Sequence, residues 1–273
     1  MKVSIVTINY NNIERLKKTL DSVAEQTYRD IEHVIVDAAS SDGSVEVIKA
    51  YANTAKHTVV WTSEKDNGIY DGMNRGIRKA TGDYIQILNS GDVLASPDVV
   101  ERMVAKIENA EYPELLYGNM IKKDYATGKI IEITGQEEYS LRLFYSSTLN
   151  HDCCYFRRDM FDTYGLYDES LKIVSDWKWF LQAIGLGQVK PVYVDIDVTI
   201  FDASGISESN LDLRNKERKQ VLEEVLPPAV LSDYGKHAFE MEQMKRLRKH
   251  HLYWFVYFIE RVFFKLEKWH ILR

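Results

Sequence analysis

Strand-like segments alternate with helix-like segments through the first hundred residues of the chain. Continuous apolar runs predict buried strands at 2–9, 31–37, 58–62 and 84–89. Apolar residues that recur every three or four positions predict helices at 12–26, 44–52 and 68–80. Strands that alternate with helices of this length form right-handed βαβ units around a parallel sheet. We therefore expect an α/β fold.

The later part of the chain continues with less regular elements. It predicts helices at 98–109, 175–183 and 211–225, strands at 115–117 and 192–198, and a hairpin over 121–134. A hairpin consists of two antiparallel strands joined by a tight turn. The 273 residues are enough for one large domain with an appendage.

Charge is distributed unevenly along the chain. The net charge is −6, which argues against a general nucleic-acid binder. Residues 236–273 nevertheless carry nine Lys or Arg against four Asp or Glu, whereas the rest carries 26 against 37. Aromatic and aliphatic residues are interleaved with these basic residues. Such a segment either lies in a membrane interface, which we favour, or packs as a helix pair on protein.

Other sequence signals concern the cellular compartment. Cys153 and Cys154 are the only cysteines, and neighbouring cysteines rarely pair, which indicates a reducing cytoplasm. We expect no signal peptide and no transmembrane segment, because the apolar runs are too short.

Four acids stand at the ends of predicted elements. Asp37 and Asp92 follow strands, Asp66 precedes a helix, and Asp176 begins one. Each alone is explained by the preference of Asp for turns and helix N-termini. Ligands in open α/β sheets, however, bind just outside the carboxyl ends of the strands. The set therefore indicates a site for a metal or a phosphorylated ligand.

Two further patterns allow more than one interpretation. Gly68, Gly72 and Gly76 recur at every fourth position, which suits either tight helix packing or a surface for a flat ligand. The run from His151 to Cys154 lacks a second metal-ligand pair at zinc spacing, so we interpret it as a pocket wall or a core position. Neither a dinucleotide-binding glycine motif nor a P-loop follows the first strand.

Several stretches resemble family 2 glycosyltransferases with the GT-A fold. They are VSIVTINYN at 3–11, VIVDAASSDGS at 34–44, SEKDNGIYDGMNRG at 63–76, LNSGD at 88–92, YGLYDES at 164–170 and SDW at 175–177. The similarity extends over about residues 3–207, and the nearest likeness is to bacterial enzymes of exopolysaccharide, capsule or O-antigen synthesis. The resemblance implies a GT-A fold, with a mixed, mostly parallel sheet flanked by helices. The GT-A domain would cover 1–207, with a nucleotide-sugar half at about 1–95 and an acceptor half at about 96–207. A helical extension would occupy 208–273.

The resemblance also implies roles for individual residues. Asp176 would be the general base, Asp92 would hold Mg²⁺ or Mn²⁺, and His151 and Trp177 would line the acceptor site. The implied nucleotide-sugar-binding residues are Thr7, Asn9, Asn11, Asp37, Asp66, Gly68, Asn74, Asn89 and Gly91. Core packing is the alternative for Trp177 and its neighbour Trp179.

The LNSGD turn departs from the family pattern. Asn89 and Gly91 stand where many relatives carry acids, so Asp92 is the remaining charged metal ligand. A later group such as Asp202 is a candidate to complete the metal shell.

The predicted function is transfer of a hexosyl or N-acetylhexosaminyl group with inversion. The donor would be a nucleotide diphosphate sugar, with UDP as the expected nucleotide, and the acceptor a saccharide hydroxyl, free or polyprenyl-diphosphate-linked. The expected setting is bacterial surface polysaccharide synthesis in the cytoplasm, peripheral to the inner face of the membrane. The alternative is a catalytically silent GT-A domain that serves as an assembly or membrane-docking module. A sugar nucleotidyltransferase would need a glycine-rich basic loop after the first strand, which YNN at 10–12 is not.

Overall fold

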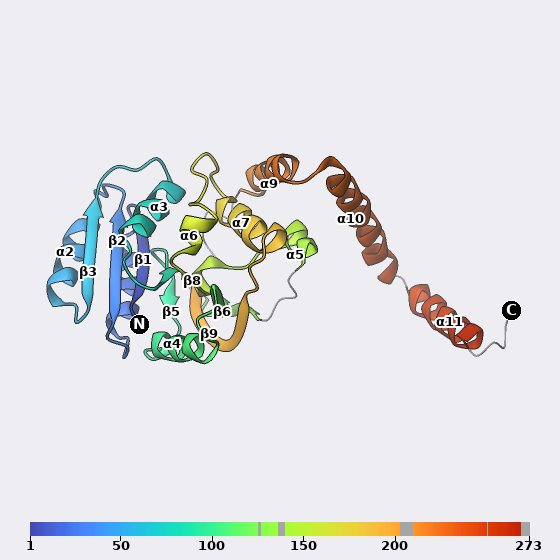
Figure 1. The fold of residues 1–273 in the computed structure, drawn as a ribbon, viewed down its shortest axis with the longest axis horizontal. Helices are drawn as coiled ribbons and strands as arrows, with labels where there is room; N and C mark the ends of the chain where they lie inside the picture. Colours follow the sequence, from blue (N-terminus) through green and yellow to red (C-terminus); the bar gives the residue numbers. More distant parts are fainter. Residues whose placement is uncertain (125–126, 136–139, 203–209, 250, 269–273) are drawn as a thin grey trace. The chain divides into compact units, whose positions relative to one another are not determined.

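The chain forms two compact units, Met1–Arg218 and Lys219–Arg273, seen in the computed structural model of Figure 1. The structure describes residues 1–124, 127–135, 140–202, 210–249 and 251–268. The division between the units falls within a helix, Leu211–Val225. The domain boundary predicted at 207/208 lies outside the described residues, so it stays a prediction.

A single mixed sheet organises the first unit (Figure 1). Its strands are β1 Val3–Asn9, β2 Ile31–Asp37, β3 Thr58–Ser63, β4 Tyr84–Ile87, β5 Val93–Leu94, β6 Leu115–Lys123, β7 Ile130–Thr134, β8 Cys154–Arg157 and β9 Val192–Asp202. The strand order is β3-β2-β1-β4-β8-β6-β9-β5, and β7 pairs with β6 beside this path. The first four strands in this order are parallel, whereas β8 runs antiparallel between β4 and β6.

Helices follow most of the strands. They are α1 Ile13–Ala24, α2 Ser44–Thr54, α3 Ile69–Lys79, α4 Val99–Asn109, α5 Leu141–Ser146, α6 Met160–Thr163, α7 Ser175–Phe180, α9 Leu211–Val225, α10 Pro228–Arg248 and α11 His251–Lys268. A 3₁₀ turn covers His151–Cys153, and a π-helical stretch, Leu181–Leu186, continues α7.

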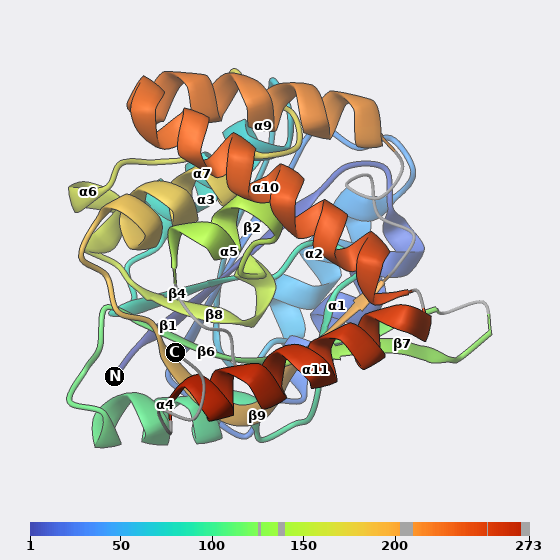
Figure 2. The ribbon, with the colours of Figure 1, turned by 90° about the vertical axis from the view of Figure 1, so that its right-hand side faces the viewer.

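The parallel strands are covered by helices on both faces, because their side chains alternate between the faces. Ile35 of β2 packs with α1 and α2, whereas its neighbour Val36 faces α3. In Figure 2 these strands run between α3 on one side and α1 with α2 on the other. A Cβ on Gly76 would lie 2.3 Å from Cγ1 of Val6, so this glycine lets α3 approach β1 closely. Tight packing therefore explains Gly76.

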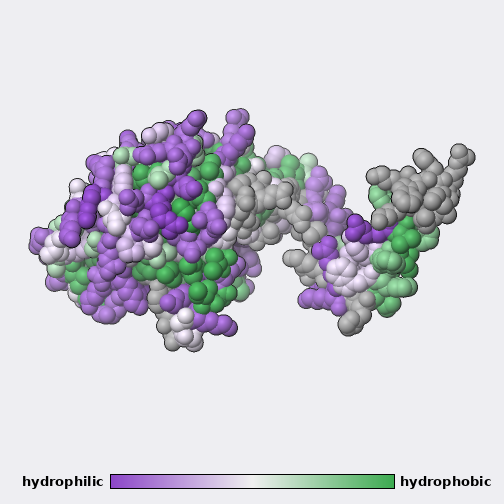
Figure 3. Space-filling model, turned by 90° about the horizontal axis from the view of Figure 1, so that it is seen from below, coloured by the Kyte–Doolittle hydropathy of each residue, from purple (hydrophilic) through white to green (hydrophobic). Residues whose placement is uncertain are grey.

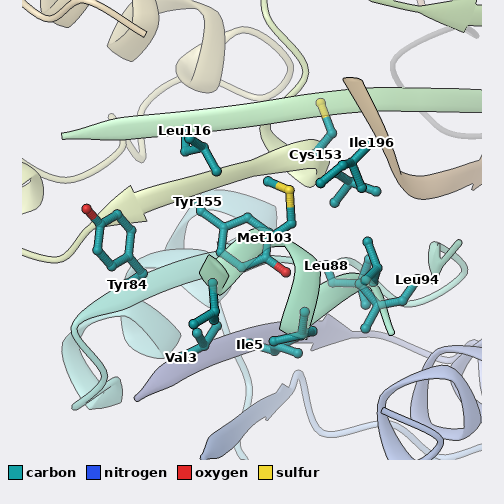
Figure 4. Packing of buried hydrophobic residues seen from close by; sticks show 14 of the residues in the cluster. Val3, Ile5, Tyr84, Leu88, Leu94, Met103, Leu116, Cys153, Tyr155 and Ile196 are labelled. Atoms are coloured by element: carbon teal, nitrogen blue, oxygen red, sulfur yellow. The ribbon is translucent and has the colours of Figure 1, made fainter. Parts of the chain in front are cut away.

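The main hydrophobic core joins the parallel and the antiparallel parts of the sheet (Figure 4). Val3 and Ile5 of β1 share one buried cluster with Met103 of α4, Tyr155 of β8 and Ile196 of β9. Burial of a large apolar side chain stabilises a fold by about 1.5–3 kcal/mol. This shared core therefore holds the ends of strands from both parts of the sheet in fixed relative positions.

The predicted fold class is confirmed, with differences in detail. β2 has the predicted bounds, and the predicted 115–117 strand is the start of the longer β6. β8 was not predicted, because its four residues carry no usable periodicity. The predicted hairpin forms between β6 and β7.

The second unit ends in α10 and α11. Most described side chains of α11 between Leu252 and Phe264 are apolar, and many are exposed, such as Trp254 at 62% and Phe258 at 66%. Figure 3 shows hydrophobic residues gathered on this part of the chain. None of the helices in the described ranges has a long enough apolar run to cross a bilayer.

Candidate active site

A cavity of about 560 Å³ lies within the first unit and gathers six of the predicted site residues. These six are Asn89, Gly91, Asp92, His151, Asp176 and Trp177. They come from the loop after β4, the 3₁₀ turn before β8 and the start of α7. The cavity volume falls in the range of small-molecule and cofactor sites.

The loop after β4 is held in shape by Thr19 of α1. The Thr19 hydroxyl accepts a hydrogen bond from the Gly91 amide at 2.9 Å and donates one to the Asp92 carbonyl at 2.8 Å. Gly91 has a φ of 115°, a value that favours glycine. The loop conformation is thus specified by the fold itself.

Asp176 is the centre of a chain of hydrogen bonds within the cavity. Its Oδ1 accepts a hydrogen bond from the Tyr70 hydroxyl at 2.8 Å, and its Oδ2 lies 3.2 Å from Nδ1 of His151. The other ring nitrogen of His151 lies 3.1 Å from Nδ2 of Asn89. The Asp176 and His151 side chains are each 18% exposed. Asp176 is therefore oriented from two sides but still reaches the cavity.

The two ionisable groups of this chain stabilise each other's charged forms. Burial lowers the pKa of His151, but the hydrogen bond and charge of Asp176, with Asp152 and Asp92, raise it overall to about 8. Burial raises the pKa of Asp176, yet the hydrogen bonds from His151 and Tyr70 and the His151 charge bring it below its usual value. At neutral pH Asp176 is thus a carboxylate, and Nδ1 of His151 donates a hydrogen bond to it.

The donor atoms near the loop suit a hard cation. Asp92 supplies a carboxylate, and Oδ1 of Asn89 is buried with no hydrogen-bond partner in the described part of the chain. Oxygen donors of this kind fit Mg²⁺ or Mn²⁺ when phosphate oxygens complete the shell. Among the described side chains, no three His, Cys, Asp or Glu residues converge as a metal site. The Asp202 side chain lies outside those described.

Asp37 lies in a second polar cluster, and its own side chain does not line the cavity. Its carboxylate is fully buried, and Oδ1 accepts hydrogen bonds from Asn9 Nδ2 at 2.9 Å and Ser40 Oγ at 2.6 Å. Oδ2 accepts from the Ser40 amide at 2.9 Å and Ser63 Oγ at 2.6 Å. Oδ1 of Asn9 in turn accepts from Ser90 Oγ at 2.9 Å. The cluster ties together the ends of β1, β2 and β3 and the loop after β4.

The other predicted nucleotide-binding residues make local contacts. Thr7 is buried and bonds His33, Asn11 accepts a hydrogen bond from the Ser41 amide, and Asp66 Oδ1 accepts one from the Gly68 amide. Burial raises the pKa of Asp66.

Asn74 joins α3 to the segment before α7. Its amide bonds the Tyr167 backbone and the Glu169 carboxylate, and it is almost fully buried. The structure therefore places Asn74 in a helix contact, away from the cavity lining.

The tryptophans of α7 are mainly core residues. Trp177 is 2% exposed, and its indole N–H donates a hydrogen bond to the Phe144 carbonyl at 2.7 Å. Trp179 packs among aromatic rings, including Phe156 at 5.4 Å between centroids. Cys153 and Cys154 are buried free thiols.

Sequence reasoning missed several residues of the cavity. Tyr70 is separated by 106 positions from Asp176, which its hydroxyl bonds, so no local pattern connects them. Arg214 and Arg218 of α9 also line the cavity. Their spacing of four places them on one helix face, a signal that was available in the sequence.

Comparison with protein families gives one match that covers more than half of the chain. Residues 4–165 match the sequence model of Glycosyl transferase family 2. A PGL/p-HBAD biosynthesis glycosyltransferase of Mycobacterium tuberculosis is 27% identical over 212 residues, which cover 77% of this chain and 80% of the relative. The uncharacterized glycosyltransferase YwdF of Bacillus subtilis is 28% identical over 266 residues, 93% of this chain and 96% of the relative.

Solved structures share the fold at low identity. TarS of S. aureus, residues 1–349 with UDP-GlcNAc, superposes with a TM-score of 0.65 at 18% identity, over 81% of this chain and 64% of that one. The mannosyltransferase PcManGT of Pyrobaculum calidifontis, with GDP-Man and Mn²⁺, gives 0.64 at 16% identity, over 87% and 69%. The mixed sheet flanked by helices is therefore the GT-A architecture.

Proposed function

The chain belongs to glycosyl transferase family 2, and we propose that it transfers a hexosyl or N-acetylhexosaminyl group from a UDP-sugar with inversion. The acceptor is a saccharide hydroxyl, and the biological setting is surface polysaccharide synthesis. One observation carries the proposal. A carboxylate oriented by two hydrogen bonds, Asp176, lines the same cavity as the loop that bears Asp92.

Asp176 is the general base of this proposal. Its lowered pKa keeps it ionised at neutral pH, so it can accept the proton of the acceptor hydroxyl. Tyr70 and His151 hold the two carboxylate oxygens in place, which limits the directions from which an acceptor can approach. A single displacement at the anomeric carbon then inverts its configuration.

Asp92 and the Asn89 amide oxygen are the proposed ligands of Mg²⁺ or Mn²⁺. When bound, the cation supplies charge neutralisation for the leaving diphosphate. Support comes from Asn89 Oδ1, which has no hydrogen-bond partner in the described ranges, and from the Mn²⁺ in the PcManGT structure. The proposed nucleotide pocket includes Thr7, Asn9, Asn11, Asp37, Asp66, Gly68, Asn74 and Gly91.

A panel of nucleotide sugars tests this function. Each donor is incubated with the full chain and Mn²⁺, and the released nucleoside diphosphate is measured with saccharide and lipid-linked acceptors. We expect release with a UDP-sugar and much less with GDP-sugars. If no nucleotide sugar of the panel is bound or turned over, the proposed enzymatic activity is wrong.

We also propose that α11 docks on an anionic membrane surface from the cytoplasmic side. Its exposed side chains are apolar around much of the helix, an arrangement that requires a cover. Exposed Arg246, Arg248 and Lys249 precede it. Apolar burial and attraction to anionic lipid then act together.

Exchanging exposed aromatics of α11 in the full chain tests the docking. Phe255→Ser with Phe258→Ser should reduce co-sedimentation with phosphatidylglycerol vesicles at least ~10-fold, because two large apolar side chains leave the interface. The control pair Ile130→Ser and Ile131→Ser removes exposed apolar residues from β7 instead. Equal vesicle binding by both variants and the wild type contradicts the proposal.

A further inference from the structure

Two arginines of α9 line the cavity, and neither forms an ion pair with a carboxylate of the described residues. Arg214 and Arg218 both line it, and the Nε of each is buried with no hydrogen-bond partner among the described residues. Like charges one helical turn apart destabilise a helix, and burial adds a desolvation cost. Guanidinium groups are well suited to phosphate oxygens. The pair therefore has the character of an anion site.

The acid nearest in sequence is engaged elsewhere. Glu217 is 6% exposed, and its carboxylate accepts hydrogen bonds from the backbone amides of Lys172 at 2.8 Å and Ile173 at 3.0 Å. These two bonds attach the middle of α9 to the segment that leads into α7. The arginines are thereby positioned with respect to Asp176 by a short, buried connection.

The pair lies on the side of the general base. The Arg218 guanidinium carbon is 5.0 Å from the ring centroid of Trp177, the residue after Asp176. Burial and the charge of Arg214 lower the pKa of Arg218, and Asp176 opposes this shift. Another arginine, Arg15, packs beside the loop after β4, where a Cβ on Gly91 would lie 3.4 Å from its Cδ.

We propose that Arg214 and Arg218 bind a phosphate group of the acceptor, close to the hydroxyl that is glycosylated. This inference rests on the proposed function and specifies its acceptor class as a phosphorylated saccharide or a lipid-linked sugar phosphate. The phosphate takes no part in the chemistry. The acceptor oxygen bonds the anomeric carbon, the bond to the diphosphate breaks, and the hydroxyl proton passes to Asp176.

Arginine side-chain NMR on the full ¹⁵N-labelled chain tests the subsite directly. Methyl phosphate is the probe, added with and without saturating UDP and Mg²⁺. We expect the Nε–H signals of both arginines to shift with methyl phosphate even when UDP is bound, because acceptor and donor phosphates occupy different places. Arg214→Gln and Arg218→Gln assign the signals, and Lys216→Gln, on an exposed position of the same helix, is the matched control.

A second experiment measures the activity of the variant that carries both Arg214→Gln and Arg218→Gln. The double glutamine variant should lose at least ~10-fold in kcat/KM with a sugar 1-phosphate acceptor, while the matching methyl glycoside and the donor KM change little. If UDP alone shifts the Nε–H signals and prevents any further shift by methyl phosphate, the pair binds the donor diphosphate and the proposal is wrong. The proposal is also wrong if methyl phosphate shifts neither Nε–H signal. A failed donor panel with retained methyl phosphate shifts would instead reject the proposed transfer reaction.

Discussion

Two polar clusters stand at the carboxyl edge of the same sheet, and they differ in how completely their hydrogen bonds are satisfied. Around Asp37, both carboxylate oxygens accept two hydrogen bonds each, and the side chain is fully buried. Around Asp176, the carboxylate is held by two groups but still lines a cavity, and Asn89 Oδ1 has no hydrogen-bond partner among the described residues. A satisfied cluster stabilises the fold, whereas an incompletely satisfied one has capacity left for a ligand.

The largest expected effect is on the open cluster. Asp176→Asn should lower kcat by about 10³-fold, because the amide cannot accept the acceptor proton. Donor affinity, measured calorimetrically with UDP, should remain within ~3-fold of wild type because the change is nearly isosteric. A parallel loss of UDP binding would place Asp176 in the donor site and not at the acceptor.

Asp92→Asn should act on the metal and the donor together. We expect about a 10²-fold lower kcat/KM, since the amide keeps the shape but removes the ligand charge. The Mn²⁺ concentration for half-maximal activity should rise, and the free energy of unfolding in urea should change little. An unchanged Mn²⁺ dependence contradicts the assignment.

Asp37→Asn should affect stability first, as expected for the closed cluster. The side-chain NH₂ of asparagine would face N–H or O–H groups that donate hydrogen bonds to the Asp37 carboxylate in the wild type. The lost hydrogen bonds should lower the free energy of unfolding, measured by urea titration, by about 1–3 kcal/mol. Asp42→Asn, at an exposed turn acid bonded to Ile13 and Ser44, is the matched control and should lose less. If the Asp37→Asn variant keeps its stability but no longer binds UDP, Asp37 is a ligand-binding residue and not a structural one.

Two histidines, the part-buried His151 and the buried His33, should make the free energy of unfolding depend on pH in opposite directions. The pKa of His151 is raised to about 8, so its contribution is complete below the unfolded value of about 6.5 and is lost as pH rises through 8, about 2 kcal/mol in all. Burial lowers the pKa of His33, bonded to Thr7 and Tyr51, to about 3. Its contribution is complete above about 6.5, and stability falls with pH towards 3.

Urea titrations between pH 4.5 and 9.5 measure both limbs. His151→Gln should flatten the alkaline limb and leave the acid limb in place. The reverse result would show that the alkaline loss comes from another group.

Much of the fold could be predicted because buried parallel strands leave a plain signal. β1 and β2 are continuous apolar runs, and the helices between them show regular apolar spacing. β8 has only four residues and follows a polar turn, so neither an alternation of apolar and polar residues nor the length of the segment identified it as a strand. No sequence pattern predicts the π-helical stretch that continues α7.

The candidate site was predictable in part for a different reason. Asp92 and Asp176 stand at element ends, where position alone suggests a ligand. The Tyr70–Asp176 and His151–Asp176 bonds join separate elements, so they depend on tertiary packing that spacing does not encode. The spacing of Arg214 and Arg218 placed them on one helix face, but it did not show that this face lines a cavity.

The Thr19 hydroxyl, which holds the loop from Asn89 to Asp92, has a consequence for the speed of binding. Because α1 shapes this loop during folding, little conformational freedom remains for an arriving nucleotide sugar to remove. Association should then be governed by diffusion and electrostatic attraction, without a slow rearrangement step. A chain with Thr19→Val would have to order the loop at every encounter, and its association rate and its affinity would fall together.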